Sequence, residues 1–230
     1  GPSLKQRGRQ VVDIISDGMK TSAKLGLIAA FGAMILGIVF GAVAALRRNR
    51  IIDKVIMVIT TAFVPMPSFI MGSLLLIVFS VKLGWLPANG STTTGLILPI
   101  VTLGLYPMAY ITRLTRSSML DVLGQDYIKT AKSKGLSQGK ILWRHALRNA
   151  IMPVVTVLGP ITAGILTGGF VVESVFGIPG LGKYFVQSIQ GLDYTMICGT
   201  TVFYGAFLII ANLVVDIAYG LIDPRVKLEG

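Results

Sequence analysis

The stretch LGLIAAFGAMILGIVFGAVAAL fills residues 25–46 and contains no Asp, Glu, Lys or Arg. Because a bilayer core about 30 Å thick needs roughly 20 apolar residues in a helix, this stretch predicts a transmembrane helix. Four further charge-free runs lie at residues 55–81, 83–112, 149–172 and 194–215. The five runs hold 125 of the 230 residues, which excludes an ordinary soluble globular domain.

The run at residues 83–112 is too long for one span and opens with the turn-forming segment LPANGSTTTG, residues 86–95. Membrane β-strands alternate apolar and polar residues, whereas these runs are continuously apolar. The predicted fold class is therefore an all-α integral membrane protein. Its five transmembrane helices are expected near residues 25–46, 55–81, 96–112, 150–172 and 195–215.

The 21 Lys and Arg residues are unevenly distributed among the connecting segments. Residues 113–148 hold eight, residues 47–54 hold four and the C-terminus holds two, whereas the alternate segments 1–24, 82–95 and 173–193 hold five, one and one. By the positive-inside rule the first set is cytoplasmic and the second external. The net charge of +11 thus reports membrane topology, and it does not indicate a nucleic-acid partner.

Five basic residues place residues 1–24 on the wrong side for a short free N-terminus. We therefore expect them to end a longer, truncated external segment, followed by a membrane domain over residues 25–228. Gly1 and Pro2 are interpreted as native residues or a protease scar, and residues 228–230 as a cloning remnant. Helical spacing within the segment predicts an amphipathic helix on the outer surface, with Val11, Ile14, Ile15, Gly18 and Met19 on one face.

Residues that carry enzyme chemistry are few. His145 is the single histidine and has no partners spaced for a zinc site or a catalytic triad. Cys198 lies within a predicted span and is expected to be a small core residue. No paired carboxylates occur inside a span, which argues against a proton-relay pump. An active-site enzyme is therefore not expected.

One segment imitates a phosphate-binding loop. GIPGLGKY at residues 177–184 nearly matches G-x-x-x-x-G-K-[ST], but Tyr184 replaces the hydroxyl that ligates magnesium. The segment also lies in a predicted external loop, away from cytosolic ATP. We expect a tight external turn leading into a short interfacial helix, with Leu181, Tyr184, Phe185 and Ile189 on one side.

The cytoplasmic segment 113–149 predicts a helical hairpin. Gly135 follows a Lys-rich turn, as at a helix C-terminus, and Ser137 is placed to cap a second helix. The first helix has an apolar face formed by Leu120, Leu123, Tyr127, Ile128 and Ala131, and the second a basic stripe formed by Lys140, Arg144 and Arg148. Spacing alone leaves two readings open: a hairpin lying on anionic lipid, or a docking surface for another protein.

The sequences DYIKTAKSKGLS at residues 126–137 and RHALRNAIMP at residues 144–153 resemble the signature loop of ABC-importer permeases. The general form of that loop is Glu-Ala-Ala, three residues, Gly, nine residues and Ile-x-Leu-Pro. Ala131, Gly135 and Leu147 match it. The departures at Lys129, Thr130, His145 and Arg148 are similar to those of the peptide-importer branch.

Further stretches are similar to the B-type permease subunit of dipeptide and oligopeptide importers. They are LRRN (residues 46–49), KLGWLP (82–87), VESVF (172–176), IPGLG (178–182) and DPRVKL (223–228). The resemblance covers nearly the whole chain but lacks the family's first helix and most of the external domain that follows it. It implies a type I importer permease core in the prokaryotic inner membrane, with a cytoplasmic coupling loop at residues 113–149.

The resemblance also implies partners. They are a homologous second permease subunit, two ATPase subunits that bind ATP and Mg²⁺, and an external substrate-binding protein. Membrane lipid is a further partner of this chain. This chain then needs no catalytic residue, cofactor or metal of its own. Its implied ATPase-coupling residues are Asp126, Tyr127, Lys129, Thr130, Ala131, Gly135, Leu136, Lys140, Arg144 and Leu147. The alternatives are a stand-alone channel or secondary transporter, or the same architecture for nickel or glutathione.

Candidates for the translocation pathway or a gate come mainly from prolines within the spans, since each proline frees the carbonyl four residues earlier. Ordinary kinks satisfied by neighbouring helices are the alternative. The candidates are Pro65, Pro67, Ser68, Tyr106, Pro107, Thr156, Pro160 and Glu173, although Glu173 also fits a solvated loop acid. Two pairs of glycines, Gly37 with Gly41 and Gly164 with Gly168, predict close helix packing.

Overall fold

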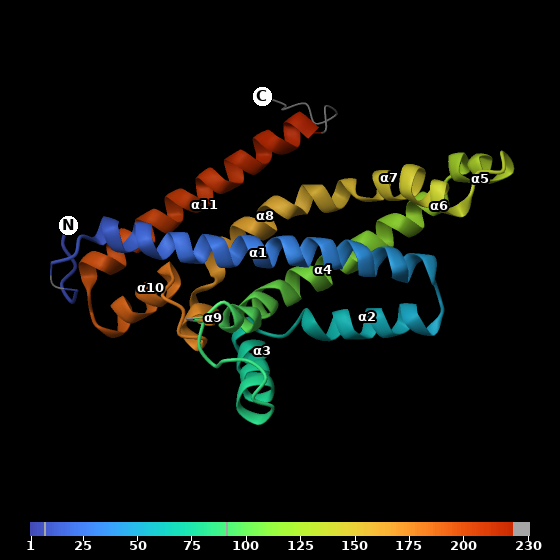
Figure 1. Ribbon diagram of the computed structural model, residues 1–230. Coiled ribbons are helices and arrows are strands. Elements are labelled where there is room, and N and C mark those ends of the chain that lie inside the picture. The colour runs from blue at the N-terminus through green and yellow to red at the C-terminus, as the bar shows by residue number, and fades with distance from the viewer. Residues whose placement is uncertain (7, 91, 223–230) are drawn as a thin grey trace. The chain divides into compact units, whose positions relative to one another are not determined.

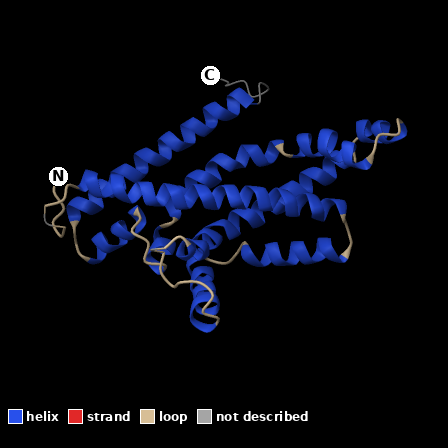
Figure 2. Ribbon diagram, viewed as in Figure 1, coloured by secondary structure: helices blue, strands red, loops and turns tan. Residues whose placement is uncertain are grey.

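The computed structural model describes residues 1–6, 8–90 and 92–222, and Figure 1 shows their helices in chain order. Apart from one bridge between Pro2 and Gln10, the regular structure of these residues is helical (Figure 2). The long helices are α1 (Val11–Leu46), α4 (Ile97–Leu123), α8 (Met152–Gly168) and α11 (Tyr194–Ile222).

Shorter helices lie between them. α2 (Ile51–Phe63) and α3 (Ser68–Leu75) precede a π-helix, η1 (Leu76–Lys82), and a 3₁₀ turn, η2 (Thr94–Leu96). The segment after α4 contains α5 (Asp126–Ser133), α6 (Gln138–Lys140), the π-helix η3 (Ile141–Leu147) and α7 (Arg148–Ala150). α9 (Phe170–Val175) and α10 (Leu181–Gln190) lie between α8 and α11.

Among the described residues, four helical segments are long and apolar enough to cross a membrane, at Val11–Leu46, Thr94–Leu123, Arg148–Leu166 and Tyr194–Val214. The predicted second span is a fifth only if its two halves count as one, since Ile51–Phe63 and Ser68–Lys82 are bent by 109° at the break. The all-α membrane fold is confirmed. Apolar side chains also face outward, as expected for membrane helices: Val202 is 72% exposed and Ile209 70%.

Three expectations differ from the structure. Residues 11–24 and the first span form the single helix α1, so residue 24 marks no boundary of structure. The apolar face of residues 11–19 is not free to contact a membrane surface, because Val11, Ile14 and Ile15 pack against Leu181 and Met196. Cys198 is exposed and is no core residue. DPRVKL at 223–228 and residues 228–230 lie outside the described part of the chain.

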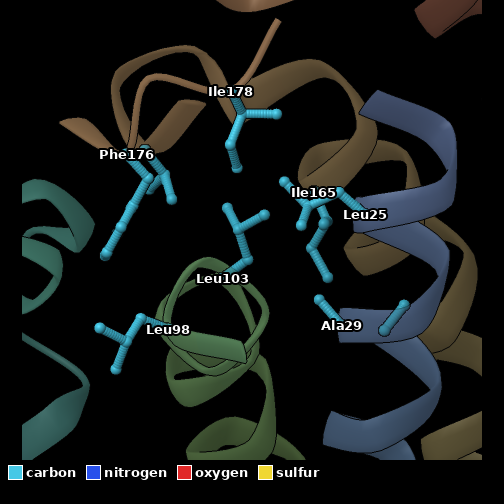
Figure 3. Packing of buried hydrophobic residues seen from close by; sticks show 9 residues of the cluster. Leu25, Ala29, Leu98, Leu103, Ile165, Phe176 and Ile178 are labelled. Atoms are coloured by element: carbon cyan, nitrogen blue, oxygen red, sulfur yellow. The ribbon is translucent and has the colours of Figure 1, made fainter. Parts of the chain in front are cut away.

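The chain divides into two compact units, which we describe separately. The first unit comprises residues 1–30, 67–104 and 159–230. Its larger core joins α1, α4 and α8 to the loop after α9, and Figure 3 shows Leu25, Ala29, Leu103, Ile165 and Ile178 in this cluster. The predicted external segments 1–24, 82–95 and 173–193 all belong to this unit.

The second unit comprises residues 31–66 and 105–158 and contains both loops predicted to be cytoplasmic. Close helix packing was predicted at Gly37 and Gly41 and is confirmed, and the helix that packs there against α1 is α4. A β-carbon on Gly37 would lie 2.7 Å from Ile111, and one on Gly41 would collide with Thr115. At the other predicted pair, a β-carbon on Gly164 would meet nothing within 4 Å.

Candidate functional site

The predicted coupling loop begins where α4 ends. The sequence predicted one helix through Leu120 and Ala131, but the structure contains two, because α4 stops at Leu123 and α5 starts at Asp126. Gly124 and Gln125 form the turn between them, with the Gln125 N–H donating to the Val122 carbonyl at 3.1 Å. Glycine weakens a helix at this point, and the change of direction gives α5 an orientation independent of α4.

The apolar face of α5 is buried within its own unit. Ile128 is fully buried and Ala131 is 7% exposed, in a cluster with Met119 of α4, Ala45 of α1 and Ile141 of η3. Leu136 and Leu147 pack against the same cluster. A helix lying on lipid needs a free apolar face, whereas this face is already covered. The burial therefore favours the docking-surface reading of the hairpin.

The opposite face of α5 carries polar groups at the surface. Asp126, Tyr127, Lys129 and Thr130 are all exposed. The assignment of Tyr127 to the buried apolar face of this helix was therefore wrong. The Lys129 Nζ lies 2.9 Å from Asp126 Oδ1, and the Thr130 hydroxyl donates to the Asp126 carbonyl at 3.0 Å. The Tyr127 hydroxyl accepts a 2.8 Å hydrogen bond from the Asn149 side chain. We call these four residues the α5 polar face; each of them takes part in a hydrogen bond within the second unit.

Gly135 ends α5 as its position in the sequence predicted. Its φ is +72°, and the Leu136 N–H donates across it to the Ala131 carbonyl at 3.3 Å. This is the six-to-one bond of a Schellman motif, accompanied by the packing of Leu136 in the cluster of Ala131. The left-handed residue thus sets the direction in which the chain leaves α5.

The second helix of the hairpin begins at the predicted cap but winds differently. The Lys140 N–H donates to the Ser137 hydroxyl at 3.4 Å, and η3 follows directly. π-helical hydrogen bonds span five residues, so the segment is not the single α-helix that the spacing predicted. The residues of the predicted stripe, Lys140, Arg144 and Arg148, fall in α6, η3 and α7. Lys140 and Arg148 are exposed, while the side chains of Arg144 and His145 lie outside the described residues.

Seven of the eight pathway candidates lie within three residues of a point where the chain passes from one unit to the other. Pro65, Pro67 and Ser68 flank the passage after Met66, Tyr106 and Pro107 follow that after Gly104, and Thr156 and Pro160 flank that after Leu158. The helix breaks at Pro65 and Pro67 but continues through Pro107 and Pro160. Prolines thus mark the places where the backbone has lost a helical hydrogen bond.

Glu173, the eighth candidate, is no solvated loop acid. It is 3% exposed, and its Oε2 accepts hydrogen bonds from the Gly182 N–H at 2.8 Å and the Lys183 N–H at 3.3 Å. Burial raises the pKa of the Glu173 carboxyl above its usual value, against the lowering effect of hydrogen bonds from Ser22 and these two N–H groups. The carboxyl serves as a cap for α10, supplied from another helix.

Sequence reasoning missed the ion pair of Asp53 with Arg116. Arg116 Nε lies 2.6 Å from Asp53 Oδ1, and Arg116 Nη2 lies 2.8 Å from Asp53 Oδ2. Asp53 is 3% exposed and is the acid of the first turn of α2. One signal for the pair was available, because both residues flank apolar runs on the predicted cytoplasmic side.

Comparison with known proteins identifies the family. The sequence pattern of the family described as "Binding-protein-dependent transport system inner membrane component" matches residues 37–228. The chain is 52% identical over 230 residues to the dipeptide transport system permease protein DppB of Bacillus subtilis (strain 168), covering all of this chain and 75% of that protein. It is 40% identical over 230 residues to the oligopeptide transport system permease protein OppB of Escherichia coli (strain K12), covering 99% and 75%.

Solved structures show the same fold at low sequence identity. An inward-facing structure of the MetNI methionine ABC transporter matches with a TM-score of 0.75 at 17% identity, covering 92% of this chain and 97% of that chain. An amino acid ABC transporter matches with a TM-score of 0.71 at 17% identity, covering 90% and 94%. This chain therefore belongs to the family of inner-membrane components of binding-protein-dependent transport systems, the permeases of ABC importers.

Proposed function

We propose that this chain forms half of the translocation pathway of an ATP-driven importer of dipeptides or oligopeptides. The relatives that match its whole length at 52% and 40% identity carry dipeptide and oligopeptide transport in their names. Nickel or glutathione is the alternative cargo of the same architecture. A stand-alone channel or secondary transporter is the alternative class, and it leaves the exposed, internally braced α5 polar face without a role.

The observation that carries ATP coupling is the two-sided construction of α5. Its apolar side belongs to the core of the second unit through Ile128 and Ala131, and its polar face is free at the surface. A force applied to that face is therefore passed to α4 and α1 through packed side chains. The proposed partners are two ATPase subunits, which hold ATP and Mg²⁺ and dock here, together with a second permease subunit and an external substrate-binding protein.

The proposed sidedness follows the charge distribution, and contacts between the loops support it. In the first unit the Gly90 N–H donates to the Phe176 carbonyl at 2.9 Å, which joins the segments 82–95 and 173–193. The Ser3 hydroxyl donates to Asp193, which adds the N-terminal segment to the same set. In the second unit Asp53 and Arg116 join the segments 47–54 and 113–148. Segments predicted to share one side of the membrane thus contact one another.

The test uses the full importer in liposomes, with ATP inside and the binding protein outside. We expect uptake of labelled dipeptide or oligopeptide that requires ATP and all subunits, and no flux through this chain alone under a substrate gradient. Gradient-driven flux without the ATPases would establish the stand-alone alternative. Competition by nickel or glutathione, but not by peptides, would retain the importer architecture and replace the cargo.

A further inference from the structure

The ion pair of Asp53 with Arg116 has a geometry that restricts direction as well as distance. Two nitrogens of the guanidinium meet two oxygens of one carboxylate at 2.6 and 2.8 Å. The planar fork of arginine makes this double contact directional, because the guanidinium and the carboxylate must face each other edge to edge. Because Asp53 is 3% exposed and the Arg116 side chain 23%, water competes little for either partner. The pair therefore fixes the start of α2 against α4.

Asp53 also holds the turn that precedes α2. Its Oδ2 accepts a 2.9 Å hydrogen bond from the Asn49 N–H, and Asn49 has a φ of +63°, which a single turn residue can adopt. Basic residues such as Arg50 and Lys54 lie close to Asp53 in the sequence, yet the carboxylate pairs with Arg116, 63 positions away. Basic residues near Asp53 in the sequence are thus available as partners, yet in the folded protein Asp53 pairs with Arg116 of α4.

The same part of α4 carries the other attachments of the second unit. Thr115, next to Arg116, packs against Gly41 of α1, and Met119, one turn later, belongs to the cluster that buries Ile128 of α5. The end of α1, the start of α2 and the coupling helix α5 are therefore all fastened to one short stretch of α4. From this stretch α2 runs to the helix break at Pro65 and Pro67.

Stability alone does not explain an ion pair at this place. Replacing a buried pair by apolar residues is often neutral or stabilising, whereas removing one partner is strongly destabilising because a charge stays buried and unpaired. An apolar contact would hold α2 near α4 but would let it slide or rotate. The bidentate pair also fixes the orientation of α2 relative to α4. A helix that passes on movement from its neighbour needs such a fixed orientation.

We propose that Asp53 and Arg116 are positioning residues that make α2 follow the coupling helix α5, so that movement imposed by the ATPases reaches the break at Pro65 and Pro67. The proposal rests on the proposed function as an ATP-coupled importer. It concerns contacts within the second unit alone. It assigns to α2 a part in coupling although α2 carries none of the signature-loop residues.

The functional test compares Arg116→Lys, which keeps the charge but loses the fork, with the apolar pair Asp53→Leu/Arg116→Leu. The matched control is Arg9→Lys, because Arg9 pairs with Asp17 at 2.8 Å in an exposed ion pair of the first unit. Each variant is assembled into the complete importer, and its thermal stability, ATPase activity and peptide uptake are measured. We expect both test variants to assemble and hydrolyse ATP, with peptide uptake per ATP reduced about fivefold or more, the lower range of coupling between sites.

Three results are decisive. If the ion pair has only a structural role, the apolar double variant should match wild type both in thermal stability and in uptake per ATP. That result would overturn the proposal. Uptake per ATP that falls equally in Arg9→Lys would also overturn it. If the wild-type complex shows no ATP-dependent peptide uptake at all, the proposed function fails, and that failure is visible before any variant is compared.

A distance measurement tests the mechanical claim directly. Spin labels at Val58→Cys on α2 and Ser133→Cys on α5, in a Cys198→Ser background, report the separation of the two helices in the assembled importer. Both positions are exposed, Val58 at 69%. We expect one narrow distance distribution in the nucleotide-free and the vanadate-trapped wild type, and a broadened distribution in Arg116→Lys. A distribution unaffected by Arg116→Lys would contradict the proposal.

Discussion

The Ser22 hydroxyl of α1 accepts the Leu181 N–H, the first of α10, at 2.9 Å. The next two N–H groups of α10 donate to Glu173 of α9, and the N-cap residue itself is Gly180, which has no side chain. A helix N-terminus leaves its first N–H groups without intrahelical partners. Here two other helices supply the acceptors, so α10 is held in place by α1 and α9 together.

We predict that Glu173→Ala destabilises the protein by about 1–3 kcal/mol, because it leaves one buried and one partly buried N–H group without an acceptor. Glu173→Gln keeps an oxygen at the same place, and because burial already disfavours the charged carboxyl, it should cost much less. Thermal unfolding of the purified protein in detergent measures both variants. Equal destabilisation by Gln and Ala would show that the cap depends on the charge.

The acid dependence of stability should come in part from Asp193. Although burial raises its pKa, hydrogen bonds from the Ser3 hydroxyl and from the Met196, Leu4 and Lys5 N–H groups hold the pKa below the usual value of 3.8. A lowered folded pKa contributes stability above the unfolded value, and this contribution is lost as the pH falls through the folded value. Asp193→Asn should therefore be less stable than wild type at pH 7, and the difference should shrink below about pH 3.8. The free energy of unfolding of both proteins is measured as a function of pH. A difference between them that stays constant from pH 7 to below pH 3.8 would contradict the lowered pKa of Asp193.

The segment around Lys183 should bind no nucleotide. The Lys183 Nζ donates to the Gly177 carbonyl of its own loop at 3.1 Å, and Glu173 occupies the helix N-terminus where a phosphate would have to lie. The N–H groups of Gly182 and Lys183, which would have to bind a phosphate, already donate to the Glu173 carboxyl. Equilibrium binding of a fluorescent ATP analogue to the purified chain should show no saturable component. Saturable binding that Lys183→Ala abolishes would disprove this prediction.

Labelling from outside the cell should separate the two predicted sides. Ala88 is a suitable labelling position in the predicted external segment 82–95 because it is exposed. Gly90 is unsuitable, because a β-carbon there would collide with Ile178. In a Cys198→Ser background, Ala88→Cys should react with an impermeant maleimide in intact cells, and Lys140→Cys should react only after lysis. The same pattern at both positions would contradict the topology derived from the positive-inside rule.

The sequence was sufficient for features with a local cause. Charge-free runs located the long helices, proline located the break after α2, and glycine located the positive φ at residue 135. Features that depend on residues distant in the chain were not accessible. The burial of Glu173 needs Ser22 and Gly182, and the role of Asp53 needs Arg116. Helical periodicity also assumes one winding, so it did not anticipate that η3 is a π-helix.

Gly135 offers the sharpest test of the coupling loop, because its cost of substitution is conformational and not steric. A β-carbon at this position would meet nothing within 4 Å, but the φ of +72° is unfavourable for residues other than glycine. The penalty is about 1–2 kcal/mol for a residue with a β-carbon and is smaller for Asn. Gly139 provides the matched control, since it is exposed in the same hairpin, has no positive φ and would also meet nothing within 4 Å.

We predict that Gly135→Val leaves the long helices folded and the importer assembled, but abolishes peptide uptake or the stimulation of ATPase activity by substrate. The β-branched residue disfavours the left-handed conformation, so the Schellman bond from Leu136 to Ala131 opens and the chain leaves α5 in another direction. The α5 polar face then no longer meets the ATPase in register. Gly135→Asn should retain most of the coupling, and Gly139→Val should resemble wild type. Substrate-stimulated ATPase in reconstituted complexes decides the matter: normal stimulation in Gly135→Val would mean that the hairpin is bound to lipid and transmits nothing.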